Sequence, residues 1–273
     1  QQCPDRLGLV GIRQLPAVSR SEGVALRQPG QTGYDTSRIP GLVTFDESTL
    51  LALYDARNER DDDLQGDIDI AINRSEDGGR TWQPMQTVLD MKEWAGYLEK
   101  YNGVSDGCIL SDDFTGDLYV IGLWMHGSWT QDGQMEENLT DTSTVWNHQW
   151  RAHGSQPGYD VKQSSQFLIS KSTDDGLTWS EPRNITRQVK KEKWWLLAPD
   201  RVVASQWKTV HWYSGRGAKR KTGFSSLQSC GVDKGENWTV GEPAYYNTNE
   251  CQVVELSDHS LMLNMRERSN RGR

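Results

Sequence analysis

Short apolar runs rich in β-branched and aromatic residues recur along the chain, and most of them end at Gly, Asp or Ser. They cover residues 50–54, 68–72, 118–124, 167–170 and 251–256. Runs of this length and composition are typical of β-strands. No long stretch carries the 3.6-residue period of an amphipathic helix, and residues 91–100 are the best short candidate for one. The pattern therefore predicts an all-β protein.

A turn motif punctuates these runs. The pattern S-x-D-x-G-x-T-W occurs at residues 75–82 and 172–179, and a degraded copy follows at 232–238. In such a box the Asp accepts backbone N–H bonds across a hairpin turn, and the Gly adopts a conformation closed to other residues. The Trp then packs between neighbouring sheets. We interpret the boxes as structural, and their spacing as typical of a propeller-like repeat array.

Composition limits the classes of partner that we expect for the chain. The net charge of −8 disfavours nucleic acid as a partner, because duplex binding needs a positive face. No apolar run is long enough for a membrane-spanning helix, so we expect no membrane span. The four Cys are scattered without a C-x-x-C pair, and no cluster has the spacing of metal ligands, so we expect neither a metal nor another cofactor. An acidic protein still binds anions where it gathers a few Arg residues.

Several short motifs follow one another in a specific order along the chain. Together with the boxes they resemble the bacterial-type exo-sialidases (neuraminidases), a family of six-bladed β-propellers. The motifs are Arg-Ile-Pro at 38–40, Asp-Ala-Arg at 55–57, Asp-Ile-Asp-Ile at 67–70, Val-Ser-Asp at 104–106, Leu-Trp-Met-His-Gly at 123–127, Asn-Glu at 249–250 and Leu-Asn-Met-Arg at 263–266. The resemblance implies an N-terminal extension over residues 1–23. A partial propeller of about four to four and a half blades would follow over 24–273.

The resemblance also assigns residues to the recognition of sialic acid, which carries a carboxylate on its anomeric carbon. Arg38 and Arg266 match two members of the Arg triad that holds this carboxylate by charge-assisted hydrogen bonds. Arg57 matches the residue that contacts a ring hydroxyl, and Asp106 would help it. Trp124 either lines the pocket for the acyl-amide group or is an ordinary core tryptophan.

Two further residues match catalytic groups of the family. Asp63, with Asp62 as the second choice, fits the acid that protonates the leaving oxygen. An acidic loop of this kind could also bind Ca²⁺, but the catalytic interpretation accounts for it better. Glu250 fits the base that activates a Tyr nucleophile. The family continues through two further blades, which supply that Tyr and the third Arg. Neither has a matching position in this sequence.

The resemblance is interrupted in one window. Residues 201–230 hold six Lys or Arg and no Asp or Glu, which is compatible with a basic surface loop or an anion-binding patch. We hypothesise instead that this window is translated out of frame. One blade would then lack its proper inner strands and would lose hydrogen-bond pairing.

The resemblance implies an exo-α-sialidase, a glycoside hydrolase that releases terminal sialic acid from glycoproteins, glycolipids and oligosaccharides with retention of configuration. We expect an extracytoplasmic location from the substrate class alone. An alternative is an inactive propeller that binds sialic acid without turnover. A third interpretation is a propeller that serves as a protein-interaction scaffold.

Overall fold

The computed structural model describes most of the chain after residue 24. The described residues are 25–44, 46, 48–58, 66–96, 98–112, 115–126, 158–161, 164–192, 198–205, 208–217, 221–229, 235–240, 248–255 and 261–267. From residue 198 onward the description concerns the backbone, with side chains only at 235–238 and at Met262. The expected extension over residues 1–23 lies outside these residues, and both domain boundaries stay predictions.

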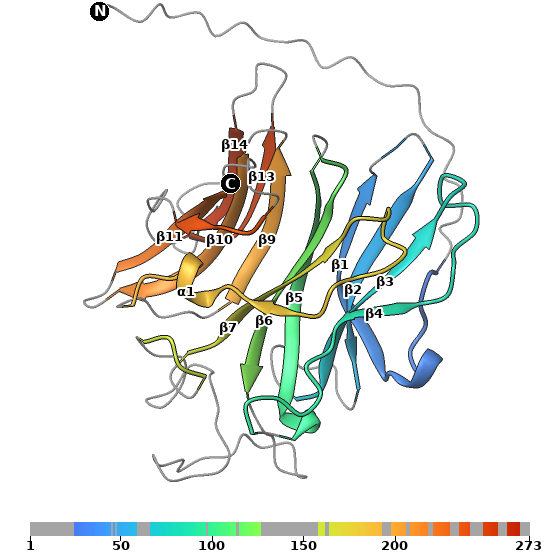
Figure 1. The fold of residues 1–273 in the computed structure, drawn as a ribbon, viewed down its shortest axis with the longest axis horizontal. Helices are drawn as coiled ribbons and strands as arrows, with labels where there is room; N and C mark the ends of the chain where they lie inside the picture. The colour runs from blue at the N-terminus through green and yellow to red at the C-terminus, as the bar shows by residue number, and fades with distance from the viewer. Residues whose placement is uncertain are drawn as a thin grey trace, which may run out of the picture.

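The described strands form four antiparallel sheets, each built from strands consecutive in sequence. Their order around the molecule follows the chain from blue to red in Figure 1. The first sheet contains β1 (Thr36–Thr44), β2 (Leu50–Arg57), β3 (Ile68–Ser75) and β4 (Gln86–Leu89). The second contains β5 (Asn102–Ser111), β6 (Leu118–His126), β7 (Gln166–Ser172) and β8 (Arg183–Asn184). The third contains β9 (Ala198–Ser205), β10 (Lys208–Gly217), β11 (Lys221–Ser229) and β12 (Thr239–Val240), and the fourth pairs β13 (Thr248–Glu255) with β14 (Leu261–Glu267).

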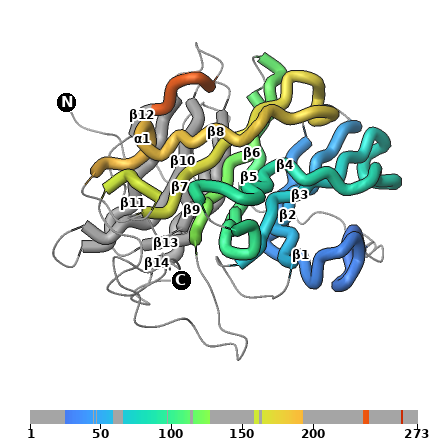
Figure 2. The backbone as a smooth tube through the Cα atoms, turned by 60° about the horizontal axis from the view of Figure 1, so that its bottom comes forward, coloured from blue at the N-terminus to red at the C-terminus, as the bar shows by residue number. Residues whose placement is uncertain are grey.

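Helical structure in the described residues is confined to three short pieces. These are η1 (Gln31–Gly33), η2 (Glu99–Tyr101) and α1 (Thr186–Val189). Helix α1 packs beside β7 and β12, and Figure 2 shows it at the outer edge of the second sheet. None of the helices in the described part of the chain is long and apolar enough to cross a membrane. The prediction of an all-β protein is confirmed. The number of blades stays a prediction with which the four sheets are compatible.

The first strand of each sheet lies next to the first strand of the following sheet. Strand β1 packs beside β5, β5 beside β9, and β9 beside β13 (Figure 1). The strands therefore radiate from a shared centre, as the blades of a propeller do. Residues on neighbouring inner strands can meet at this centre although they lie far apart in sequence.

Apolar side chains fill the space between the first two sheets. The buried cluster joins side chains from β2, β3 and β4 to side chains from β5, β6 and β7, and several are fully inaccessible to solvent. Its members include Leu51, Leu53, Ile70, Ile72, Leu89, Val104, Leu118, Val120, Trp124 and Leu168. Burial of this much apolar surface is the main stabilising contribution to the contact between the two blades.

The opposite face of the first sheet is covered by the segment that precedes β1. Tyr34 and Met85 pack there against a small cluster that includes Tyr54. The Tyr34 hydroxyl donates to Asp69 Oδ2 at 2.8 Å, and Arg27 Nε donates to the Tyr54 hydroxyl at 2.7 Å. This face therefore combines a few apolar contacts with partly buried polar pairs.

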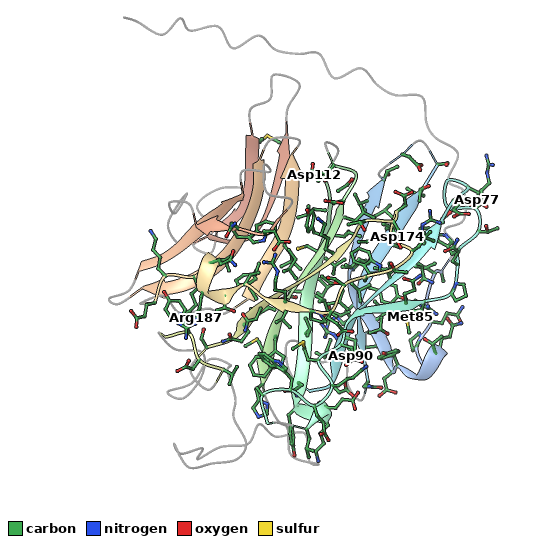
Figure 3. The ribbon with its side chains drawn as sticks, viewed as in Figure 1. Asp77, Met85, Asp90, Asp112, Asp174 and Arg187 are labelled. Atoms are coloured by element: carbon green, nitrogen blue, oxygen red, sulfur yellow. The ribbon has the colours of Figure 1, made fainter. Side chains whose placement is uncertain are left out.

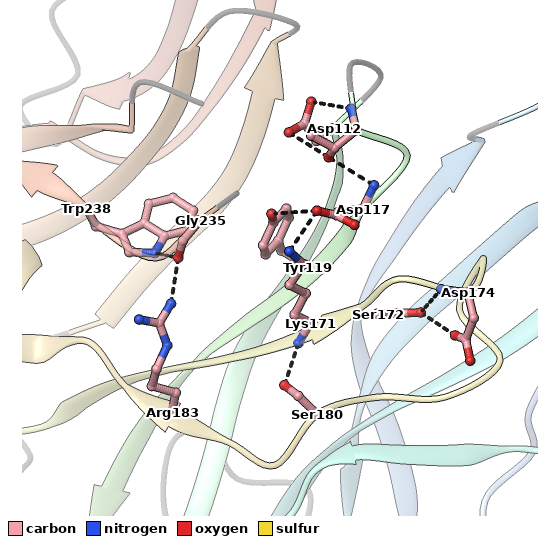
Figure 4. Close-up of polar contacts among 11 residues, drawn as sticks. Asp112, Asp117, Tyr119, Lys171, Ser172, Asp174, Ser180, Arg183, Gly235 and Trp238 are labelled. Atoms are coloured by element: carbon pink, nitrogen blue, oxygen red, sulfur yellow. Dashed lines mark hydrogen bonds and ion pairs between the residues drawn. The ribbon is translucent and has the colours of Figure 1, made fainter. Parts of the chain in front are cut away.

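The two complete boxes form the turns that the sequence predicts. In the first, the Asp77 carboxylate accepts hydrogen bonds from the Thr81 amide at 2.8 Å and from the Thr81 hydroxyl at 2.6 Å. These bonds lower the pKa of Asp77 to about 2. Gly79 adopts a φ of 84°, which favours glycine. Asp174 makes the corresponding contacts in the second box, and its bond to Ser172 appears in Figure 4.

The third box is hydrogen-bonded to the second sheet and packs against it. Arg183 donates to the backbone carbonyl of Gly235 at 2.5 Å (Figure 4) and to that of Glu236 at 2.8 Å. Trp238 is buried and meets Tyr119 edge-on at a centroid distance of 6.2 Å. The degraded copy thus keeps the packing role expected of a box.

The basic window 201–230 does not leave its blade without strands. It provides the end of β9 and all of β10 and β11, which pair in continuous antiparallel register from Thr209–Ser229 to Gly217–Lys221. The expectation of lost pairing is therefore wrong, because β9, β10 and β11 provide partners for one another's backbone N–H and C=O groups. The hypothesis of an out-of-frame window stays a prediction.

Candidate active site

Three of the inner strands carry a β-bulge at a residue that the sequence singled out or next to one. The register shifts lie between Arg38 and Gly41 in β1, between Ser105 and Cys108 in β5, and between Asn249 and Cys251 in β13. A bulge adds an unpaired residue to one strand and redirects the side chains around it. Residues near the shared centre are thereby turned out of the regular alternation of the strand.

A buried ion pair lies at the end of β2. Arg57 Nη2 is 3.0 Å from Asp55 Oδ2, and both side chains are fully buried. The Ser105 hydroxyl of β5 donates to the same carboxylate oxygen at 2.6 Å. Burial raises the pKa of Asp55, while the Ser105 hydroxyl and the Arg57 charge lower it in part. The pair therefore connects the first sheet to the bulge of the second.

Two further residues predicted to bind the sugar, Arg38 and Asp106, lie next to this pair. Arg38 is exposed and lies directly opposite Asp55 in the β1–β2 register. Directly paired residues share a face of the sheet, so Arg38 and Asp55 lie on one side of it. Asp106 is partly exposed and follows Ser105 with a φ of 53°. Arg38, Arg57 and Asp106 thus come from three strands and two sheets to one region at the centre.

Glu250 and Arg266 occupy the fourth sheet. Asn249 pairs with Arg266 across β13 and β14, and Glu250 is the residue in the bulge beside this pair. Strand β13 packs beside β9, which in turn packs beside β5. The backbone thus places Glu250 on the same array of inner strands as Asp106, with Arg266 on the strand that pairs with β13.

The proposed acid Asp63, like its alternative Asp62, lies outside the described residues. The residues that flank this segment, Asn58 and Asp67, are described and bonded to each other. Asn58 Nδ2 donates to Asp67 Oδ2 at 2.6 Å, and the Asn58 backbone N–H donates to the Asp67 carbonyl. Asn58 directly follows Arg57. The loop therefore leaves and rejoins the sheet next to the buried ion pair.

Trp124 lies in the core. It is completely buried, its Nε1 donates to Asn102 Oδ1 at 3.2 Å, and it meets Trp94 edge-on at a centroid distance of 4.8 Å. Of the two interpretations that the sequence left open, these contacts are those of a core tryptophan.

The boxes lie at the end of the sheet away from these residues. In the β2–β3 register Arg57 is opposite Ile68, where β3 begins, whereas Ser75 of the first box ends the same strand. Figure 3 shows Asp77 and Asp174 at one end and Asp90, just after β4, toward the other. Among the described residues, no three His, Cys, Asp or Glu side chains are arranged to hold a metal ion.

Sequence reasoning did not single out Asp55 and Ser105. Both stand in motifs that it quoted, two residues before Arg57 and one residue before Asp106. The signal for Asp55 was available, since residues i and i+2 of a strand share a face and opposite charges on that face attract. Ser105 had no such signal, because its partner is 50 residues away.

Comparison with known proteins agrees with the fold. The family model of the BNR repeat-like domain matches residues 48–273. A sialidase of Bacteroides fragilis is 37% identical over 270 residues, which are 97% of this chain and 45% of that protein. A sialidase of Micromonospora viridifaciens is 28% identical over 254 residues, which are 89% of this chain and 34% of that protein.

Solved structures give the same result. The Hadza microbial sialidase Hz136 superposes with a TM-score of 0.73 at 35% identity, over 90% of this chain and 44% of that one. The chain belongs to the sialidase family, and its fold is the sialidase β-propeller. The resemblance drawn from the short motifs is thus confirmed. The chain spans less than half the length of these relatives.

Proposed function

We propose that the protein is an exo-α-sialidase that hydrolyses terminal sialic acid from glycoproteins, glycolipids and oligosaccharides with retention of configuration. The observation that carries the proposal is the convergence of Arg38, Arg57 and Asp106 from two sheets at the centre of a sialidase propeller. A sugar acid needs guanidinium groups for its carboxylate and polar groups for its ring hydroxyls. This region supplies both kinds.

The residues divide substrate binding and catalysis among them in this proposal. Arg38 and Arg266 bind the carboxylate by charge-assisted hydrogen bonds. Arg57 and Asp106 bind a ring hydroxyl. Asp63 protonates the leaving oxygen, and Glu250 takes the proton of a Tyr nucleophile. No position of this chain matches that Tyr or the third Arg of the triad.

A neutral phenol is a suitable nucleophile next to the substrate carboxylate, because an anionic nucleophile would be repelled. The resulting covalent intermediate is then hydrolysed with Asp63 as the base, which gives net retention. The substrate class also leads us to propose an extracytoplasmic location for the protein.

Binding is tested by calorimetry with sialic acid on the wild-type chain and on an Arg38→Ala variant. We expect the variant to bind about 10- to 100-fold more weakly, since one charge-assisted interaction is lost. Arg80→Ala is the matched control, because Arg80 is exposed on the first box. Equal affinities for all three proteins would contradict the proposal and favour a scaffold.

A fluorogenic sialoside separates the enzyme from a binding propeller. Release of the fluorophore by the protein, and its loss in Glu250→Gln, is expected of the enzyme. Binding without release is expected of the alternative, a propeller that holds sialic acid without turnover. The same assay is applied to the whole protein as its gene encodes it.

A further inference from the structure

The Asp55 carboxylate is the junction of two sheets. It accepts hydrogen bonds from Arg57 Nη2 at 3.0 Å on its own strand and from the Ser105 hydroxyl at 2.6 Å on β5. The backbone N–H of Gly107 is a further donor to it. The side chains of Asp55 and of its partner Arg57 are both fully buried.

Two of these donors flank Asp106 in the chain. Ser105 precedes Asp106 and Gly107 follows it, so Asp55 holds the β5 bulge on both sides of that residue. Asp106 has a φ of 53°, in the left-handed region that costs free energy for a residue other than glycine. Such a conformation persists only where the surrounding contacts impose it.

Gly107 makes the approach of the two sheets feasible. A Cβ atom at this position would lie 2.8 Å from Ile70 Cδ1 and 3.1 Å from Leu53 Cδ2 of the first sheet. Any larger residue would push the bulge away from β2 and β3. The absence of a side chain therefore lets the bulge reach the carboxylate.

The third partner, Arg57, forms a buried ion pair with Asp55 at 3.0 Å. Arg57 is fully buried, and a buried guanidinium without a counter-charge is strongly unfavourable. Removal of the carboxylate would take away this ion pair and its hydrogen bond and favour another position of the side chain.

We propose that Asp55 is a positioning residue that presents Arg57 and Asp106 to the sugar ring as one unit. This inference rests on the proposed function, because it assumes that Arg57 and Asp106 bind a ring hydroxyl. The new element is that both residues need the Asp55 carboxylate for their orientation.

The test measures the affinity of the whole protein for a methyl sialoside and for analogues that each lack one ring hydroxyl. In the wild-type protein, loss of the hydroxyl bound by Arg57 and Asp106 weakens binding. Asp106→Asn identifies that hydroxyl. Only for the analogue that lacks it is the loss of affinity relative to the parent sialoside smaller in the variant than in the wild-type protein. We expect Asp55→Asn to bind the parent sialoside at least about tenfold more weakly and to show the same selective loss of discrimination.

Ser105→Ala is a milder variant that removes one hydrogen bond and leaves the ion pair in place. We expect about three- to tenfold weaker binding with the same selectivity. Asp69→Asn is the matched control, because Asp69 is a buried carboxyl on the other face of the same sheet. It should leave the discrimination among analogues unchanged.

The outcomes are distinguishable. If Asp55→Asn and Ser105→Ala weaken every analogue by the same factor, or none, the positioning role is refuted while sialoside binding stands. If the wild-type protein binds no sialoside, the proposed function fails and the inference fails with it. Thermal unfolding of each variant confirms that the folded state is compared, and Ser105→Ala alone decides the question if Asp55→Asn does not fold.

Discussion

The most direct physical prediction concerns Asp69, a buried carboxyl on the first sheet. It lies on the face covered by the segment before β1, and its hydrogen bond from the Tyr34 hydroxyl is 2.8 Å long. Burial raises the pKa of Asp69 from 3.8 to about 8. The negative charges of Asp90, Asp67 and Glu99 add to this effect, whereas the Tyr34 hydroxyl opposes it.

The sign of the pH dependence follows from this pKa. In the unfolded chain Asp69 ionises near pH 4, while in the folded protein it stays protonated up to about pH 8. The folded state therefore holds one more proton between these values, and its stability falls as the pH rises through them. The full effect is on the order of 5 kcal/mol, of which about 4 kcal/mol develops between pH 5 and pH 8.

Asp69→Asn removes this titration but keeps an oxygen that can accept the Tyr34 hydroxyl. We expect the variant to gain about 4 kcal/mol of unfolding free energy relative to the wild-type chain on going from pH 5 to pH 8. Urea unfolding at pH 5, 6.5 and 8, followed by tryptophan fluorescence, measures the difference. Tyr34→Phe should instead lose unfolding free energy relative to the wild-type chain as the pH rises. It removes the donor that lowers the pKa of Asp69.

Parallel curves of unfolding free energy against pH for the wild-type chain and Asp69→Asn would refute this reasoning. They would mean that Asp69 ionises alike in the folded and unfolded states, and hence that water reaches it.

Three further predictions test the packing of the blades. Gly107→Ala should lower the free energy of unfolding by about 1–3 kcal/mol, because its Cβ would lie 2.8 Å from Ile70 Cδ1. Gly41→Ala is the control: its Cβ meets only ordinary contacts, so urea unfolding should show a change of less than about 0.5 kcal/mol. Asp77→Ala should lower the thermal midpoint in scanning fluorimetry without changing sialoside affinity, since the box lies away from the site; a change in affinity would contradict this separation. Arg183→Ala removes two hydrogen bonds to the third box and should cost about 1–2 kcal/mol, and an unchanged midpoint would show that the box docks without them.

Local patterns predicted four strands of the first two sheets, β2, β3, β6 and β7. The runs at 50–54 and 68–72 lie in β2 and β3, and both are bounded by turns whose chemistry is visible in the sequence. The boxes were equally readable, because Asp, Gly and Thr act within one turn. The window 201–230 misled the prediction, since its strands depend on pairing with each other more than on composition.

The candidate site was predicted by resemblance, and the structure adds the contacts of Asp55 to it. Motif order brought out Arg38 and Arg57, but the role of Asp55 depends on a contact with Ser105 across two sheets. Contacts between distant segments leave no local pattern, and a β-bulge shifts which side chains share a face. For this reason the sequence could name the groups that we propose to bind the sugar, but not the buried carboxylate of Asp55 that contacts Arg57 and Ser105.

The position of the boxes has a practical consequence for experiments on this protein. The turn at Gly78 and Arg80 is exposed, and the strand that leads to it ends far from the guanidinium groups. A fluorophore or surface tether attached at Arg80 would leave the opposite mouth of the propeller open to large glycans. Immobilised in this orientation, every molecule on a sensor chip would face the analyte.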